Sequence, residues 1–467
     1  MKIELPFVGG AYTARSKNLS AQECQNFYVE IDKEGGKNIV SLIGTPGMKL
    51  WKNVANGGEL RAGGLHVMGE YLYSVIDKTI YRISKTKVVT NLGDINTSTG
   101  QVWMGNNGTY VVIVDGEDGW YISGTTLTQI TDASFPTPAG MDYQDGFWLV
   151  LKKDTDEIYY NTSADDPTAW DATDFFVAEG SGDKMRGLIS SNRIIRMYGF
   201  ESTEIWYKSA SGFDRNPGGF MEIGCGSVGS ISEIEGVNLW LDNKGRVCQT
   251  AALSYAPVST YQIDYQLSKL TNKENSVSYC YSQEGHNFYV LTFPDDNKTF
   301  CYDIKTGFWH TRASTIRDLR HNGNCHALFN EKNIVGGNGD GNLYEYDLDT
   351  YADNGIPFRS IRSAQAAQKD KGNIFVNYFE LDFESGVGLS SGQGSDPKAM
   401  LEYSWNGGQT WSNEIWEGIG KIGAYADKVR FDQLGSGYNG FVPRITISDP
   451  VKRVIINAYL DGEVGYH

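Results

Sequence analysis

The stretch Thr79-Ile80-Tyr81-Arg82-Ile83 sets the pattern on which most of the chain is built. Apolar and polar side chains alternate along it, which is typical of a β-strand with one face buried. It follows another alternating apolar run and a polar turn, so the two runs together indicate a hairpin.

The same unit occurs seven times between residues 60 and 350. Consecutive units are 38 to 54 residues apart, and their mean spacing of about 44 residues matches one four-stranded propeller blade. A single blade cannot bury both faces of its small sheet, whereas radial stacking of several blades can. The sequence therefore predicts an all-β fold with a β-propeller of about seven blades, anchored by Tyr81, Tyr121, Tyr159, Trp206, Val247, Cys301 and Tyr344.

The segments on either side of the repeats differ from them. Residues 1–55 form an irregular lead-in that we expect to contribute strands to the propeller, which spans 56–357. Residues 358–467 predict a C-terminal β-sandwich, with a polar connector over 358–372 and a long alternating strand over Ile374–Phe383.

Two short helices are expected in this otherwise all-β chain. Ser259–Leu270 places apolar side chains on one face at helical spacing behind a Ser or Thr cap, where the spacing between repeats is longest. Leu19–Asn26 is the other candidate, in the lead-in.

Composition and charge narrow the classes of function that the chain can have. The net charge is −16 with no cluster of Lys and Arg, so a conventional DNA-binding surface is not predicted. The six cysteines form no CxxC pair, and no apolar run is long enough for a membrane span or a secretory signal. These features predict reduced thiols in a protein folded in cytoplasm.

Paired carboxylates are the first candidate chemistry. A glycosidase needs two of them on opposite sides of a bond. Asp115, Glu117 and Asp118 cluster, as do residues 154–157, yet both groups are typical of turns between strands.

The motifs that could indicate a metal site or a catalytic nucleophile are equally weak evidence for either. In a strand, Cys325 and His326 would point to opposite faces, so with His321 they would not converge on zinc. Gly336–Asn342 lacks the closing Glu of an EF-hand loop, and Gly224–Gly229 matches a nucleophile elbow only loosely. We therefore predict no catalytic residue, no metal site and no cofactor site.

The octapeptide Ser404–Trp411 resembles the Asp-box hairpin of sialidase propellers, with Asn406 in place of the acidic residue. In the families that carry it, the box is structural and lies away from the active site. It predicts a stable hairpin in which Trp411 packs back over the turn.

Several stretches, in order along the chain, match the motifs of one known family. The N-terminal block is Arg15-Ser-x-x-Leu19-Ser-Ala-Gln-Glu-Cys24-x-Asn26-x-Tyr28-x-Glu30, followed by Gly35-Gly-Lys37 and Gly44-Thr-Pro-Gly47. Further matches are Ser202–Tyr207, Phe220–Gly226, Gly229–Ile231, Asn238–Val247, Ala256–Thr260, and Ile447–Pro450 with Ile455–Tyr459. Together these stretches resemble the packaged-DNA stabilisation, or tail-hub, proteins of P22-like short-tailed bacteriophages.

The resemblance implies a structural virion protein without catalytic residues. Members of this family form a ring, typically of six copies, below the head-to-tail adaptor. The ring extends the DNA channel, holds the tail needle or plug, and supports tailspikes or tail fibres. An acidic lumen would let double-stranded DNA pass without adhering. The location implied is the virion tail, with synthesis and assembly in the host cytoplasm.

An alternative remains open at this point. A glycan-binding or glycan-cleaving propeller protein of a phage tail would also explain the Asp-box resemblance and the tryptophans. We expect contacts with neighbours at the Gly-rich connections Ser211–Gly219 and Gly386–Pro397, since loops on a rigid scaffold carry recognition.

Overall fold

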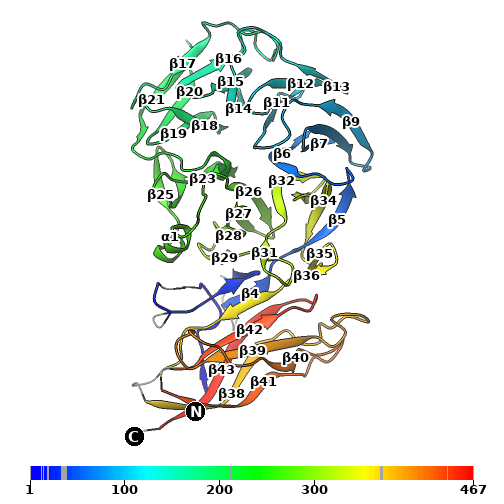
Figure 1. The fold of residues 1–467 in the computed structure, drawn as a ribbon, viewed down its shortest axis with the longest axis vertical. Coiled ribbons are helices and arrows are strands. Elements are labelled where there is room, and N and C mark those ends of the chain that lie inside the picture. Colours follow the sequence, from blue (N-terminus) through cyan, green and yellow to red (C-terminus); the bar gives the residue numbers. More distant parts are fainter. Residues whose placement is uncertain are drawn as a thin grey trace.

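A computed structural model describes residues 2–11, 13, 15–17, 20–32, 39–210, 212–368, 372–438 and 440–465. Within them, seven antiparallel blades of four strands each surround a common centre, and a β-sandwich lies against one side of this ring (Figure 1). The propeller and the C-terminal sandwich predicted from the sequence are confirmed.

The first four blades each follow the order of their strands in the chain. Blade one consists of β6 (Leu60–Met68), β7 (Tyr71–Ile76), β8 (Thr79–Ser84) and β9 (Val89–Asp94); blade two of β10 (Trp103–Asn106), β11 (Tyr110–Val114), β12 (Gly119–Ser123) and β13 (Thr126–Gln129). Blade three consists of β14 (Pro138–Gln144), β15 (Phe147–Lys152), β16 (Glu157–Tyr160) and β17 (Phe175–Val177); blade four of β18 (Met185–Ser191), β19 (Ile194–Gly199), β20 (Thr203–Lys208) and β21 (Phe213–Met221).

The last three blades complete the ring, and the seventh borrows a strand from the N-terminal part of the chain. Blade five consists of β22 (Ser232–Ile234), β23 (Val237–Leu241), β24 (Val247–Ala251) and β25 (Ser254–Pro257); blade six of β26 (Val277–Gln283), β27 (His286–Phe293), β28 (Lys298–Asp303) and β29 (Trp309–Thr311). Blade seven consists of β32 (Gly323–Phe329), β33 (Lys332–Gly337), β34 (Asn342–Asp347) and β5 (Gly47–Asn53).

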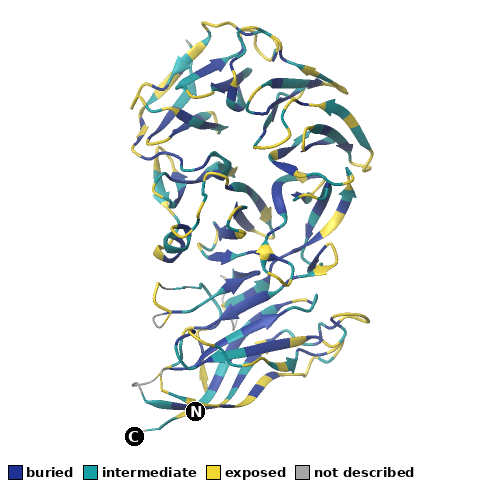
Figure 2. Ribbon diagram, in the orientation of Figure 1, coloured by how far each residue is buried: buried dark blue, intermediate teal, exposed yellow. Residues whose placement is uncertain are grey.

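All seven anchors predicted from the repeat lie in the third strand of their blade, from Tyr81 in β8 to Tyr344 in β34. The structural repeat therefore has the register that the sequence pattern indicates. Because side chains alternate along each strand, both faces of a blade are buried against its neighbours. Figure 2 shows the result, with buried residues following the strands and exposed ones gathered in the outer loops.

Closure of the ring is carried by an apolar core between blades seven and one. Leu60 and Leu72 of blade one pack with Ile334 and Leu343 of blade seven, and all four are 0% exposed. Strand β5 strengthens this closure because it pairs with β34 and contributes Trp51 to the same core. Residues far apart in the chain thus fasten the ring.

The sandwich is built from the C-terminal segment and most of the lead-in. One sheet contains β3 (Phe27–Ile31), β4 (Val40–Gly44), β43 (Val454–Gly465), β38 (Asn373–Phe383), β41 (Val429–Gly437) and β1 (Lys2–Glu4). The facing strands are β2 (Cys24–Gln25), β37 (Ser360–Ser363), β42 (Val442–Ile447), β39 (Lys398–Ser404) and β40 (Ile415–Gly418).

The lead-in, expected to add strands to the propeller, supplies one such strand, β5. Strands β1, β3 and β4 pair within the sandwich, because β1 and β4 take the edge of β43 that β38 leaves free and β3 pairs with β4. The short helix expected at Leu19–Asn26 is wrong: Cys24 and Gln25 form β2 between two other strands. Leu19 itself lies outside the described residues.

The other predicted helix is confirmed as α1 (Tyr261–Leu267), capped by Thr260. A 3-10 helix, η1 (Val228–Ser230), precedes blade five; two small hairpins, β30 (Ala313–Ser314) with β31 (Leu319–Arg320) and β35 (Ala352–Asp353) with β36 (Ile356–Pro357), lie near the junction with the sandwich (Figure 1).

One sheet runs through both domains. Outer strand β29 of blade six pairs in parallel with β2, which pairs with β37, so nine strands from β26 to β40 form a single hydrogen-bonded sheet. The propeller and the sandwich are therefore joined through their backbones.

All six cysteines lie among the described residues, and none forms a disulfide. Five are buried, and Cys280 is half-buried beside the core between blades five and six. No helix in the described parts of the chain is long and apolar enough to cross a membrane.

Candidate functional site

Two of the carboxylates considered from the sequence, Asp115 in a turn and Glu157 in β16, have local partners. Asp115 is 4% exposed, and its Oδ1 accepts the backbone N–H groups of Glu117 at 3.1 Å and Asp118 at 2.8 Å. Glu157 forms an ion pair with Lys152 at 2.6 Å. Asp115 thus stabilises the backbone of its own turn, as acidic turn residues do, and Glu157 is paired with a lysine.

The candidate zinc ligands do not converge. Cys325 belongs to the core between blades seven and one, whereas His326 faces blade six and stacks on Tyr279 at 6.2 Å. Nε2 of His321 lies 2.6 Å from the Tyr346 hydroxyl. Burial lowers the pKa of His321 to about 3 and that of His326 to about 4, and raises that of Cys325 to about 12. Nowhere in the described part of the chain do three His, Cys, Asp or Glu side chains gather as metal ligands.

The EF-hand-like loop at Gly336–Asn342 and the loose nucleophile-elbow match at Gly224–Gly229 are also structural. Asp340 accepts the Asn342 N–H at 3.0 Å and the Tyr344 hydroxyl at 2.5 Å, which closes a turn of blade seven. Ser227 is 0% exposed and donates its hydroxyl to the Glu274 carbonyl at 2.8 Å, so it is not presented as a nucleophile.

The hairpin at Ser404–Trp411 keeps the geometry of an Asp-box with an amide. Oδ1 of Asn406 accepts the N–H groups of Gln409 at 3.0 Å and Thr410 at 2.9 Å, the task of a carboxylate. Trp411 lies beside the turn, and the Arg444 guanidinium stacks on its ring at 3.9 Å. The motif stabilises the sandwich and carries no argument for glycan chemistry.

The distinctive polar chemistry lies at the junction of propeller and sandwich. Arg362 and Arg453 are fully buried, and Arg312 is 3% exposed. Arg362 donates to the carbonyls of Phe7 at 2.7 Å and Gly10 at 3.2 Å. Buried charges are costly unless hydrogen-bonded, so each guanidinium holds its segments in one arrangement.

The other two arginines connect further segments. Arg453 donates to the Ser360 hydroxyl at 2.9 Å and stacks on Phe358 at 4.4 Å. Burial lowers its pKa to about 10. Arg312 lies over the ring of Tyr281 at 5.2 Å and donates to its hydroxyl. Cation–π contacts of this kind replace part of the lost hydration.

Asn26 is the point where three segments meet. Its φ of 53° is in the left-handed region, where Asn is tolerated better than most residues. Its side chain donates to the carbonyls of Ala313 at 2.8 Å and Arg359 at 2.7 Å, and accepts the Ala313 N–H at 3.0 Å. One amide therefore links lead-in, propeller and connector.

His286 adds an ionic link. Its Nδ1 lies 2.7 Å from Asp303 in the same blade, and its Nε2 lies 2.7 Å from Glu30 of β3. Hydrogen bonding to Asp303 is the main cause that raises the pKa of His286, helped by Glu30 and opposed by burial.

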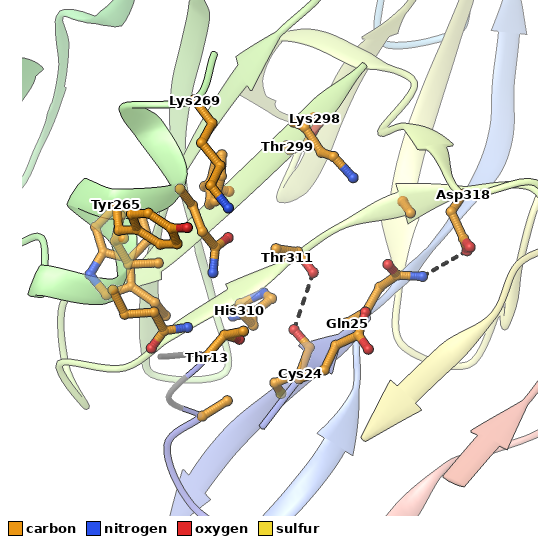
Figure 3. Close-up of a pocket in the computed structure, with 18 of the residues that line it drawn as sticks. Thr13, Cys24, Gln25, Tyr265, Lys269, Lys298, Thr299, His310, Thr311 and Asp318 are labelled. Carbon is orange, nitrogen blue, oxygen red and sulfur yellow. Dashed lines mark hydrogen bonds between the residues drawn. The ribbon is translucent and has the colours of Figure 1, made fainter. Parts of the chain in front are cut away.

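A cleft of about 580 Å³ lies beside this junction, between α1, the start of β28 and the lead-in. Its floor includes Phe300 and Trp309. Figure 3 shows Lys269 and Lys298 extending into the space above the strand that carries Thr311. The cleft thus combines an apolar floor with a charged rim.

The cleft is basic although the chain is acidic. Six Lys and Arg side chains line it against three carboxylates: Arg15, Lys17, Lys269, Lys298, Arg312 and Arg444 against Glu23, Asp296 and Asp318. Asp318 is paired with Arg359, and Asp296 accepts the Thr271 N–H at 3.0 Å. Arg15 and Lys269 both stack on Tyr265, at 5.7 and 4.0 Å.

Sequence reasoning missed both the junction and the cleft. Arg312, Arg362 and Arg453 have no local pattern that marks them as buried. Arg15 and Asn26 belong to the N-terminal block of the resemblance, which gives them no role of their own. The irregular connection expected over Ser211–Gly219 is wrong for residues 213–219, which belong to strand β21, with Ser211 outside the described residues. The contact with neighbours expected at this segment stays a prediction. Gly386–Pro397 is irregular as expected, and Gly35–Lys37 is not described.

Comparison with solved structures returns propeller-like chains of low similarity. BamB from Moraxella catarrhalis is 7% identical, with 74% of this chain and 95% of that chain covered and a TM-score of 0.40. The Pan2 WD40 domain of Neurospora crassa is 9% identical, with coverages of 61% and 88% and a TM-score of 0.39. The designed protein Ika8 is 12% identical, with coverages of 65% and 99% and a TM-score of 0.37. No curated protein matches the chain.

Family models match both domains separately. The model described as "Bacteriophage P22 Gp10, beta-propeller" matches residues 3–351, and that described as "Bacteriophage P22 Gp10, beta-sandwich" matches residues 361–463. The two matches follow each other in the order of the two domains of the fold. The chain belongs to the bacteriophage P22 Gp10 family and is a structural protein of a phage tail.

Proposed function

We propose that this chain forms the hub, or nozzle, of a short phage tail. Copies of it assemble as a ring, of six in the family it resembles, below the head-to-tail adaptor. The ring extends the DNA channel, stabilises packaged DNA, and offers surfaces to a needle or plug and to tailspikes or fibres. Family membership across both domains is the observation that carries the proposal.

The rigidity of the chain supports this role. A hub must transmit load between the head and the attached fibres, so its domains must not separate. Here a nine-stranded sheet crosses the domain boundary, and the side chains of Asn26 and His286 hydrogen-bond across it. This arrangement suits a scaffold better than a hinged enzyme.

The charge of the chain supports passage of DNA. A net charge of −16 repels the phosphate backbone, so DNA could move through a ring of such chains without adhering. Double-stranded DNA would therefore be a transient, non-specific partner.

A deletion of the gene in the phage tests the proposal. Particles that lack the chain should package DNA and then lose it, and supply of the chain in trans should restore both DNA retention and tail attachment. Normal DNA retention and infectivity without the chain would overturn the proposal.

A further inference from the structure

The positive charge on the rim of the basic cleft is not neutralised by ion pairs within the described part of this chain. The rim residues Arg15, Lys17, Lys269 and Lys298 are exposed, and none of them forms an ion pair with a described carboxylate. Unpaired cations around a hollow with an apolar floor are suited to bind a segment that carries carboxylates beside an apolar or aromatic side chain.

This chain carries such a segment on the opposite side of the propeller. Residues 154–183 of blade three contain nine Asp and Glu residues and no Lys or Arg, so they hold more than half of the net charge of −16. The outer strand β17 lies within this segment as the edge of the blade, with Phe175 37% exposed (Figure 1). Asp171 and Glu179 flank it and are also exposed.

The two surfaces cannot meet within one molecule. Blades four and five separate blade three from blade six on one side of the ring, and blades two, one and seven separate them on the other. Two complementary surfaces on opposite sides of a subunit are what a head-to-tail contact requires, and such contacts generate rings when the rotation closes.

We propose that the acidic edge of blade three of one copy docks into the basic cleft of the next copy. Exposed carboxylates of this edge, such as Asp171 and Glu179, pair with Arg15, Lys17, Lys269 and Lys298, and Phe175 packs toward the apolar floor of the cleft. This inference rests on the proposed tail ring and names the contact that holds neighbouring subunits together.

Charge reversal tests the contact in assembled tails. In K269E/K298E the cleft repels the acidic edge, so we expect ring incorporation to fall by about tenfold or more. D174K/E179K should have the same effect from the other side. The variant that combines all four substitutions restores opposite charges on the two surfaces and should regain rings. K421E/K428E makes the same charge change at exposed positions on the sandwich and should assemble normally.

Zero-length cross-linking of wild-type tails identifies the contact directly. A carbodiimide joins Lys Nζ to carboxylates in contact, so peptides containing Lys269 or Lys298 should be joined to peptides from 154–183. Tails assembled from isotopically light and heavy copies should give mixed pairs, because the link lies between copies.

The outcomes separate this inference from the proposed function. Rings that form at the wild-type level in K269E/K298E, with no cleft-to-edge links, would overturn the contact and leave the tail hub intact. Absence of the wild-type chain from tails would overturn the hub itself. A K269E/K298E chain that is unfolded by circular dichroism shifts the decision to D174K/E179K and the cross-links.

Discussion

The seven cores between blades consist mainly of apolar side chains, whereas the junction with the sandwich depends on buried polar and charged side chains. The core between blades one and two, for example, is apolar and comes from residues close in the chain, such as Val111, Ile113 and Ile122 with Val75. The junction depends on Arg312, Arg453, Arg362 and Asn26, and the partners of the last two are hundreds of residues away. Burial of apolar surface makes the ring, whereas directional hydrogen bonds fix how the sandwich is attached to it.

The largest effect is expected inside the propeller. Trp240→Ala removes a fully buried indole from the core between blades four and five, and should lower the free energy of unfolding by about 3–5 kcal/mol. Thermal unfolding followed by circular dichroism measures it. Trp416→Ala is the matched control because Trp416 is 51% exposed, and an equal loss there would contradict the account.

Arg362→Met should act beside the junction and change the number of unfolding transitions. It leaves the Phe7 and Gly10 carbonyls without their charged donor, at a cost of about 2–4 kcal/mol. Calorimetry should show one transition in the wild-type chain and two in the variant, because Arg362 and Phe7 both belong to the sandwich, which would then melt before the propeller. Arg317→Met, at an exposed position, should keep a single transition.

Asn26→Ala should cost less, about 2 kcal/mol, because it removes three hydrogen bonds and places Ala at a positive φ. Asn26→Gly tolerates the backbone conformation but still loses the bonds. Its stability, measured in urea, should therefore lie between Asn26→Ala and wild type. Equal stability of all three chains would remove Asn26 from the junction.

The smallest effect is the pH dependence of His286. Its pKa is raised in the folded state, so protonated His286 stabilises the junction below the unfolded pKa of about 6.5. That stabilisation is lost as the pH rises through the higher folded pKa. The Tm of the wild-type chain should fall across this window more than that of His286→Gln, and identical pH profiles would exclude the link.

The contrast between the repeated blades and the junction also explains how much of the fold and of the site could be predicted from the sequence. The propeller repeats a local pattern of alternation, so anchors such as Tyr81 and Tyr344 mark the third strands directly. Strand β2 is two residues long, and its place is set by β29 and β37, which no local pattern of Cys24 and Gln25 reveals. The basic cleft is equally hidden, because Arg15, Lys269 and Lys298 come together only when the lead-in folds against blade six.

The most direct test of the account is an electron cryomicroscopy reconstruction of the phage tail that contains this chain. It should resolve a ring of copies below the adaptor, each with a closed seven-bladed propeller continuous with its sandwich through β29, β2 and β37. An open propeller, a sandwich that moves independently of it, or a tail whose hub density is another protein would contradict the account.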